Sequence, residues 1–308
     1  MKHWRYEGQR HMEVRRNDHG KGKLSTVTCI ATDAGFRVAS VIIEGKEEVV
    51  VVDTQWTLAN AHRVVAEILE IDKPIKAIFV THAHPDHYFG TQVFTDAFPN
   101  APVYAFEDDV PVIDEQFLPK LGHWKEEIGE HNMADRPISF TPYKDGVLDL
   151  DGFEIKAIPH CWGDLKWNSK VVIPSIKTVI CSDIVFSDAH PFTCEVPPMK
   201  GWDAWIQELE NIRAEGFDVI IPGHAAFGRR FDESGLDYTK EYLEATKKHF
   251  EAAAKSDNKE ARVYQFFYNM ELDFFDSELR KSNEMNANVL LGDREWNEQW
   301  NENWEEEG

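Results

Sequence analysis

The chain has 308 residues, of which 42% are hydrophobic and 12% aromatic, and it carries a formal net charge of −22 at pH 7. This apolar content suffices for one large domain or two small ones and excludes disorder over most of the length. The excess of acidic residues opposes binding to nucleic acid or to an anionic membrane, because such binding needs a basic surface that displaces counterions. We therefore expect a small molecule as the partner, with no nucleic acid and no membrane.

The N-terminal segment mixes charged and aromatic side chains and contains no apolar run of the kind that a secretion signal needs. No later stretch reaches the length of a membrane-spanning helix. The four cysteines are sparse and form no CxxC pair, which argues against a disulfide framework or a cysteine-rich zinc module. These features favour a cytoplasmic protein.

The first regular elements predicted along the chain are strands. β-Branched runs separated by glycine and charged residues predict a meander of three strands at residues 24–31, 36–44 and 47–53. Apolar residues then recur at helical spacing from Leu58 onward, which predicts an amphipathic helix that ends near Asp72. The continuous apolar run at residues 75–80 is typical of a strand that is buried on both faces.

Three imidazoles and one carboxylate follow that buried strand within six residues: His82, His84, Asp86 and His87. In an extended segment, residues i and i+2 point the same way, so His82 and His84 can reach one cation. The turn imposed by Pro85 sends Asp86 and His87 to the other side, so that one short loop could serve two metals. Imidazole and carboxylate ligands suit Zn²⁺, with Mn²⁺, Fe²⁺ or Co²⁺ as alternatives.

The segment His82-x-His84-x-Asp86-His87 resembles the signature of the metallo-β-lactamase superfamily, and the strands and helix before it follow the order that the superfamily uses. Four further positions resemble other functional positions of the family, in the right chain order over roughly residues 24 to 230. Asp53 resembles a carboxylate that holds a metal-ligating imidazole, and His160 resembles the third histidine of the first metal site. Asp183 resembles the carboxylate that bridges the metals, and His224 resembles the last histidine of the second site.

The resemblance implies an α/β protein with the αββα sandwich of this superfamily and with added C-terminal helices. It further implies a metal-dependent hydrolase with two zinc ions, in which a metal-bound hydroxide is the nucleophile. The implied ligands of the first metal are His82, His84 and His160, those of the second are Asp86, His87 and His224, and Asp183 bridges them. Asp86 is the candidate catalytic residue, which would orient the hydroxide or pass a proton to the leaving group.

Two departures from the family pattern weaken any inference about the substrate. Gln55 and Trp56 stand where the family often has glycine, and Pro159 and Cys161 flank the third histidine in place of its usual neighbours. We favour an ester or lactone as the substrate. The alternatives are a thioesterase similar to glyoxalase II, an amide hydrolase of the β-lactamase type, a mono-iron persulfide dioxygenase and a non-enzymatic metal-binding sensor or scaffold.

We expect segments outside the predicted core to determine the substrate specificity. Residues 106–145 form a long connection, which is either a lid or a helical segment that packs on the core. Trp162 directly follows the third histidine and is the best candidate for a pocket wall. The loop after Asp183 adds His190 and Phe192 as further pocket candidates.

We divide the chain into an N-terminal extension (1–23), a catalytic domain (24–232), a helical C-terminal extension packed on it (233–292) and an acidic tail (293–308). Helical spacing predicts helices near residues 202–216, 234–255 and 259–282. A strand is predicted at residues 217–221, between the first two of these helices. The tail places Trp296, Trp300 and Trp304 four residues apart, which favours docking onto a groove of the same chain or of a second copy. A homo-oligomer is therefore possible.

Overall fold

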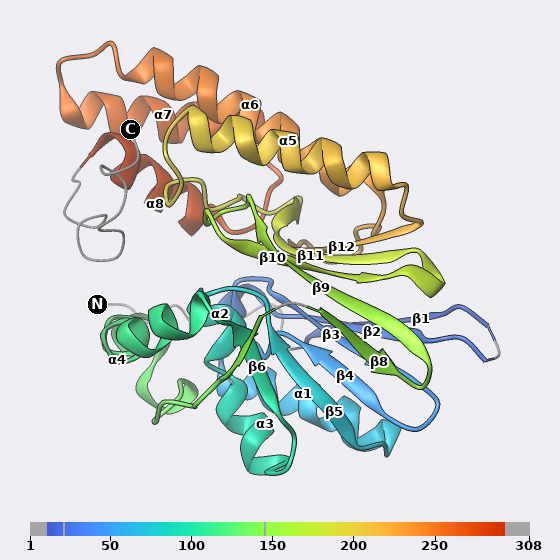
Figure 1. Cartoon of the computed structure of the whole chain (residues 1–308). Coiled ribbons are helices and arrows are strands. Elements are labelled where there is room, and N and C mark those ends of the chain that lie inside the picture. Colours follow the sequence, from blue (N-terminus) through green and yellow to red (C-terminus); the bar gives the residue numbers. More distant parts are fainter. Residues whose placement is uncertain (1–10, 21, 145, 293–308) are drawn as a thin grey trace. The chain divides into compact units, whose positions relative to one another are not determined.

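The computed structural model describes residues 11–20, 22–144 and 146–292 (Figure 1). The Trp-containing acidic tail lies outside the described residues. The chain forms two compact units, with the described residues up to Pro159 and Ser169–Ile180 in unit 1, and His160–Asn168 and Cys181 onward in unit 2. One boundary between the units therefore falls inside a single strand, between Ile180 and Cys181.

Unit 1 contains a seven-stranded sheet whose strands follow one another in chain order: β1 (Glu13–Asp18), β2 (Ser25–Ile30), β3 (Ala39–Glu44), β4 (Val49–Val52), β5 (Ile75–Val80), β6 (Val103–Phe106) and β7 (Thr141–Tyr143). The strands β1 to β4 pair antiparallel, which confirms the predicted meander, and β4 to β7 pair parallel. A parallel pair needs a crossover, and helices supply it between β4 and β5 and between β5 and β6.

Helices form the crossovers of unit 1, and the first of them is capped at both ends. Helix α1 (Leu58–Ile71) begins after Thr57, whose side chain accepts a hydrogen bond from the backbone N–H of Asn60, and it ends at Asp72 in the left-handed conformation. Helices α2 (Pro85–Tyr88) and α3 (Thr91–Ala97) form the next crossover. Helices α1 and α3 lie side by side (Figure 1).

Helix α4 (Asp109–Ile128) occupies much of the long connection that we interpreted as a lid or a packing segment. Its Trp124 ring lies 4.7 Å from the Trp56 ring, and its Phe117 ring lies 5.0 Å from that of Phe89. Both Trp124 and Phe117 are buried. These aromatic contacts favour the packing interpretation, because a lid must leave its contacts at a small energetic cost.

A second, five-stranded sheet has the order β12-β11-β10-β9-β8. Its strands are β8 (Gly146–Leu150), β9 (Phe153–Cys161), β10 (Asn168–Ile173), β11 (Thr178–Ser187) and β12 (Val219–Ala225). Every residue of β10 and β11 is buried, although β10 begins with the polar residues Asn168, Ser169 and Lys170. Short 3₁₀ turns at Asp33–Gly35, Glu130–Asn132 and Pro174–Ile176 complete the loops.

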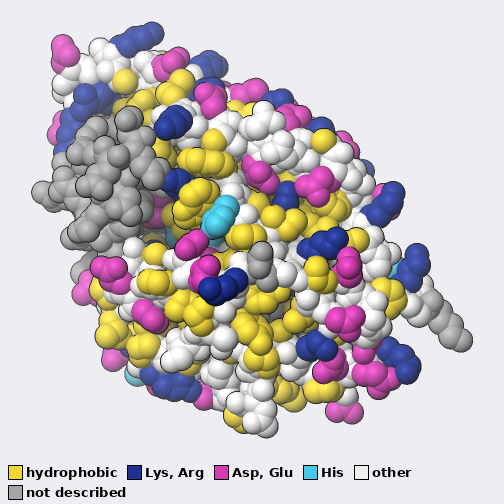
Figure 2. All heavy atoms as spheres, in the orientation of Figure 1, with side chains coloured by type: hydrophobic (Ala, Val, Ile, Leu, Met, Phe, Trp, Pro, Cys, Tyr) yellow, Lys and Arg dark blue, Asp and Glu magenta, His cyan; other side chains and the backbone are white. Residues whose placement is uncertain are grey.

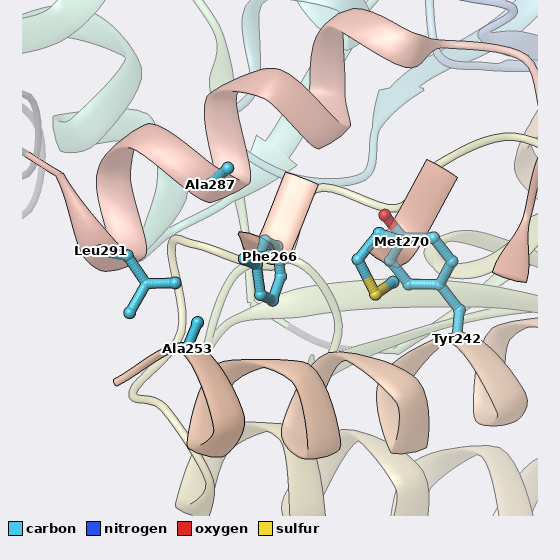
Figure 3. Close-up of a cluster of buried hydrophobic side chains, with 6 residues drawn as sticks. All are labelled: Tyr242, Ala253, Phe266, Met270, Ala287 and Leu291. Carbon is cyan, nitrogen blue, oxygen red and sulfur yellow. The ribbon is translucent and has the colours of Figure 1, made fainter. Parts of the chain in front are cut away.

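Four longer helices belong to unit 2: α5 (Lys200–Glu215), α6 (Glu233–Ala253), α7 (Lys259–Asp273) and α8 (Arg280–Leu291). The last three share a buried apolar cluster, drawn in Figure 3, that consists of Tyr242, Ala253, Phe266, Met270, Ala287 and Leu291. The predicted helix at 259–282 is interrupted, because Phe274 leaves the helical conformation and Leu279 adopts a φ of 61°. Within the described part of the chain, no helix is long and apolar enough to cross a membrane.

Candidate metal centre

The histidine-rich loop of unit 1 joins β5 to α2, and its histidines are buried. His82 and His87 are fully buried and His84 nearly so. The ring centroids of His82 and His84 lie 4.9 Å apart, and those of His82 and His87 lie 4.2 Å apart. A ligand atom of His82 lies within 4.8 Å of one of His84, and Asp86 and His87 form a second such pair. The loop therefore gathers four metal-ligand side chains in one place, as the sequence predicts.

Asp53, at the end of β4, anchors this loop. Its carboxylate accepts hydrogen bonds from the Thr81 backbone N–H at 2.9 Å and from the Thr81 hydroxyl, and Oδ2 lies 2.8 Å from His87 Nδ1. A carboxylate in this position fixes the tautomer with the proton on Nδ1, so that Nε2 of His87 is the ring atom that would ligate a metal. The contact agrees with the role that the resemblance implies for Asp53.

Gln55 explains one departure from the family pattern. Its φ is 74°, in the left-handed region where glycine is the usual residue. Its side-chain amide donates hydrogen bonds to the carbonyls of Cys29 and Val38 and to the hydroxyl of Ser40. These contacts with β2, β3 and their flanking backbone offset the strain, and the neighbouring Trp56 is buried in the aromatic cluster under α4.

Asp109, in the first turn of α4, is a buried carboxyl group that the sequence analysis did not single out. Its pKa is raised to about 8, mainly by burial and in part by the neighbouring Asp108, while His84 acts in the opposite direction. A carboxyl group with this pKa is mostly protonated at pH 7 and can donate a hydrogen bond. Its electrostatic interaction with His84 identifies it as part of the surroundings of the ligand loop.

Unit 2 contributes Asp183 on β11 and His224 on β12. Both are buried, and His224 Nε2 lies 3.0 Å from Asp183 Oδ2. The ring of Phe186 stacks on His224, with 5.1 Å between centroids and 5° between planes. Gly223 allows this close approach, because a Cβ there would lie 2.0 Å from Asp183 Oδ1 and 2.5 Å from the Ser182 carbonyl carbon.

Asp164 is a further ligand candidate in unit 2 that sequence reasoning missed. It is buried, and a carboxylate oxygen lies within 4.8 Å of one of Asp183. His160, which we predicted as a ligand, is exposed at the end of β9, with a φ of 61° and its ring 4.9 Å from that of Trp167. The only sequence signal for Asp164 was an acidic residue four positions after His160, with no pattern to mark it.

The three pocket candidates have different surroundings. Trp162 is half-buried, with its ring centroid 6.3 Å from that of Trp167, and Phe192 is half-buried. His190 is fully buried, its Nδ1 lies 3.0 Å from the Tyr242 hydroxyl on α6, and its Nε2 lies 3.5 Å from a Glu271 carboxylate oxygen on α7. Its contacts are therefore with the C-terminal helices.

The environment of His190 keeps its ring neutral. The pKa of His190 is lowered to about 4, mainly by burial and in part by the positive charge of Arg280. The Glu271 carboxylate would favour a charged ring, but it also pairs with Arg280 Nε at 2.8 Å, and this pair offsets its charge. A neutral His190 is thus a structural link between the loop after β11 and the helices α6 and α7.

The chemistry of the donors fits a divalent transition metal. Each unit presents buried imidazole and carboxylate groups, and in unit 1 a second carboxylate holds one imidazole in the tautomer that ligation requires. Nitrogen and oxygen donors of this kind suit zinc, manganese, iron or cobalt. The candidate ligands thus include Asp164 beside the residues that the sequence predicts.

Three curated proteins are similar to parts of the chain. A probable metallo-hydrolase of Streptococcus pyogenes is 29% identical over 177 residues, which are 54% of this chain and 71% of that protein. The alpha subunit of a 2,4-dinitroanisole O-demethylase from a Nocardioides species is 26% identical over 66% of this chain and 56% of its own length. A linear primary-alkylsulfatase from a Pseudomonas species is 46% identical over 54 residues, which are only 10% of that protein.

Solved structures and a family model identify the fold and the family of the chain. A metallo-beta-lactamase from Pontibacter korlensis aligns over 76% of this chain and 99% of its own, with a TM-score of 0.58 and 19% identity. The DIM-1 metallo-beta-lactamase aligns over 75% of this chain and 97% of its own, with a TM-score of 0.54 and 20% identity. The family model of the metallo-beta-lactamase superfamily matches residues 33–224. Because this match covers more than half of the chain, the protein belongs to the metallo-beta-lactamase superfamily.

Proposed function

We propose that the protein is a metal-dependent hydrolase that cleaves an ester or lactone bond in a small molecule, with two zinc ions as cofactors. The observation that carries this proposal is the anchored ligand loop, in which Asp53 holds His87 while His82, His84 and Asp86 lie in the same turn. A loop that served only as a connection would gain nothing from burying three histidines beside a buried carboxylate.

The bound metals would lower the pKa of a water molecule and polarise the substrate oxygen. We assign the metal ligands from the order of the family motifs along the chain. The family match runs from residue 33 to 224 and includes residues of both units. The residues that would hold the metals are His82, His84, Asp86 and His87 of unit 1 and His160, Asp183 and His224 of unit 2. Asp164 is a further candidate for the same ligand set.

The chain's own residues orient the groups and move protons. Asp53 keeps the His87 proton on Nδ1, so that Nε2 is the ring atom that would bind a metal. Asp86 has a side chain that is 13% exposed, whereas His87 beside it is fully buried. In this proposal the Asp86 carboxylate would accept a proton and return it to the leaving group.

The similar proteins support the class of reaction. One is named as a metallo-hydrolase, a second is named for the removal of a methyl group from an oxygen of 2,4-dinitroanisole, and a third for the cleavage of primary alkyl sulfates. The last two names favour a second candidate function, the cleavage of an ether or sulfate ester at oxygen. Because the chain covers 56% and 10% of those two proteins, their substrates remain proposals for this chain.

The surface charges support a small substrate in place of a polyanion. On the face drawn in Figure 2, the described Lys and Arg side chains are interspersed with Asp and Glu. The whole sequence carries a net charge of −22, so a nucleic acid would meet repulsion over most of the surface.

The test is to measure the metal content of the purified full chain and its hydrolysis of a substrate panel. The panel contains lactones, aryl esters, thioesters, β-lactams, phosphodiesters, an alkyl sulfate and an aryl methyl ether. We expect two metals per chain and chelator-sensitive turnover of an ester or lactone. His82→Ala should lose metal and activity, whereas the matched control His62→Ala, on the exposed face of α1, should retain both.

Each alternative has its own outcome in this experiment. Preference for thioesters or β-lactams would replace the substrate class and keep the mechanism. A single iron per chain with oxygen consumption on glutathione persulfide would indicate a dioxygenase, and stoichiometric metal without turnover would indicate a sensor or scaffold. Less than one metal per chain together with no chelator-sensitive turnover would overturn the enzyme assignment.

A further inference from the structure

Helix α7 is apolar on two opposite sides. Its inner side contributes Phe266 and Met270 to the buried cluster with α6 and α8 (Figure 3). Large apolar side chains also recur every three or four residues along its outer side and just beyond its end. They are Tyr264, Tyr268, Leu272 and Phe275, with exposed fractions of 66%, 47%, 57% and 77%. We call these four side chains the α7 stripe. A helix that is apolar on two sides normally has a neighbour on both.

The neighbouring helices have an ordinary outer face. Apart from an alanine near its end, the exposed positions of α6 carry only polar or charged side chains, which include Glu233, Asp237, Glu241, Glu244 and Lys248. Those of α8 are Arg280, Glu284 and Asn288. Exposed leucines elsewhere in the described chain, such as Leu69 and Leu118, belong to helices of unit 1. The α7 stripe is thus a contiguous apolar surface on an otherwise polar set of helices.

We propose that the α7 stripe is a homodimer interface, in which α7 packs antiparallel on α7 of a second copy about a twofold axis. A twofold interface must be self-complementary, so each residue needs a suitable partner when the order is reversed. With the axis near the middle of the stripe, Tyr264 faces the partner's Phe275, and Tyr268 faces the partner's Leu272. Every stripe residue then meets an apolar partner, and the helical part of the stripe, from Tyr264 to Leu272, is about 12 Å long.

The charges at the two ends of α7 suit the antiparallel arrangement. The first turn contains Lys259, Glu260 and Arg262, with a net charge of +1. The C-terminal end contains Asp273, the last residue of the helix, and Asp276 just beyond it, with a net charge of −2. An antiparallel partner places each basic end next to an acidic end. A parallel partner would place like charges together, which is unfavourable.

The size of the stripe is sufficient for a reversible dimer. Fully buried aromatic side chains remove about 150–250 Å² each from solvent, so four side chains with these exposed fractions offer about 500 Å². Two copies would then bury about 1,000 Å², which is at the lower limit for a specific interface. The rings of Tyr264 and Tyr268 are already stacked, with 5.8 Å between centroids and 10° between planes, so little side-chain freedom is lost on association.

The experiment is sedimentation velocity on the full-length protein over a range of concentrations, with light scattering to give the mass. We expect a dimer that dissociates on dilution. Tyr268→Lys combined with Leu272→Lys should raise the dissociation constant at least tenfold and give a monomer. The matched controls Leu69→Lys and Leu118→Lys replace equally exposed leucines outside the stripe and should leave the dimer intact. Circular dichroism and metal content establish that each variant is folded.

Three results would overturn the proposal. One is a wild-type chain that is a monomer at every concentration, and another is a folded stripe variant that remains a dimer. The third concerns the tail, because Trp296, Trp300 and Trp304 also recur at a step of four residues. If the chain without residues 293–308 dimerises and the full chain does not, the tail is the occupant of the stripe in place of a second copy.

Discussion

The contact between Asp53 and His87 allows a sharp test of how the ligand loop is organised. In Asp53→Asn, the side chain keeps its volume, but an NH₂ group, which donates and does not accept, replaces one carboxylate oxygen. The His87 Nδ1–H and the Thr81 N–H and hydroxyl all point at this side chain, so one of these donors must lose its acceptor. The His87 imidazole is then free to change its tautomer or to rotate.

The expected loss can be estimated from these contacts. Removal of a carboxylate that holds a metal-ligating imidazole costs about 10–100-fold in metal affinity or activity. This range corresponds to about 1.4–2.8 kcal/mol. The fold itself should survive, because the amide in Asp53→Asn can still accept the hydrogen bonds of Thr81 through its carbonyl oxygen.

The assay is a chelator competition that measures the metal dissociation constant, together with the steady-state rate on the best substrate. Asp151→Asn is the matched control, because Asp151 accepts a hydrogen bond from the Glu47 N–H in the same unit and is not a ligand candidate. A metal affinity within twofold of the wild type in a folded Asp53→Asn variant would refute the reasoning, since it would mean that His87 does not depend on Asp53.

Three further predictions concern unit 2. If the buried carboxylate is a ligand, Asp164→Ala should lower the metal content more than His160→Ala, as measured by elemental analysis. Gly223→Ala should destabilise the fold by about 1–3 kcal/mol in urea unfolding and reduce metal binding, because the new Cβ would collide with Asp183 and with the backbone. Because the unfolded chain binds a proton on His190 that the folded chain excludes, stability should fall as the pH decreases from about 6.5 to about 4, by up to about 3 kcal/mol.

Each of these predictions has a control. Equal metal loss in the two alanine variants would leave both side chains as ligand candidates, and a loss confined to His160→Ala would contradict the first prediction. Gly122→Ala, in α4 with open space around its Cα, should be neutral or stabilising in the same unfolding assay. His190→Gln should remove the part of the acid sensitivity that comes from this ring, and an unchanged pH profile would contradict the assignment.

Local pattern in the sequence sufficed for the elements that lead to the ligand loop. The strand at 75–80 and the helix at 58–71 were predicted almost to the residue, because their apolar periodicity is strong and because both are bounded by clear stop signals. The ligand loop was equally visible, since its four ligand-type residues lie within six positions of one another. Features of this kind depend on neighbours in sequence, and a single sequence displays them directly.

Other features depend on partners that are distant in sequence. Strand β1 has half-exposed, charged residues and exists because it pairs with β2, so no apolar pattern marks it. Similarly, Gln55 adopts a left-handed φ because β2 and β3 accept its side-chain hydrogen bonds. The end of α7 near Phe274 was missed because no glycine or proline marks it in the sequence.

The sequence by itself thus determined the family, the main elements and the first group of metal ligands. Only the tertiary structure decided that Asp164 lies beside Asp183 and that Asp109 is a buried carboxyl group near His84. It also decided that the His190 ring is held by α6 and α7. The physical reason is that burial and charge depend on which segments the folded chain brings together. The sequence around an isolated Asp or His does not show which groups surround its side chain in the folded protein.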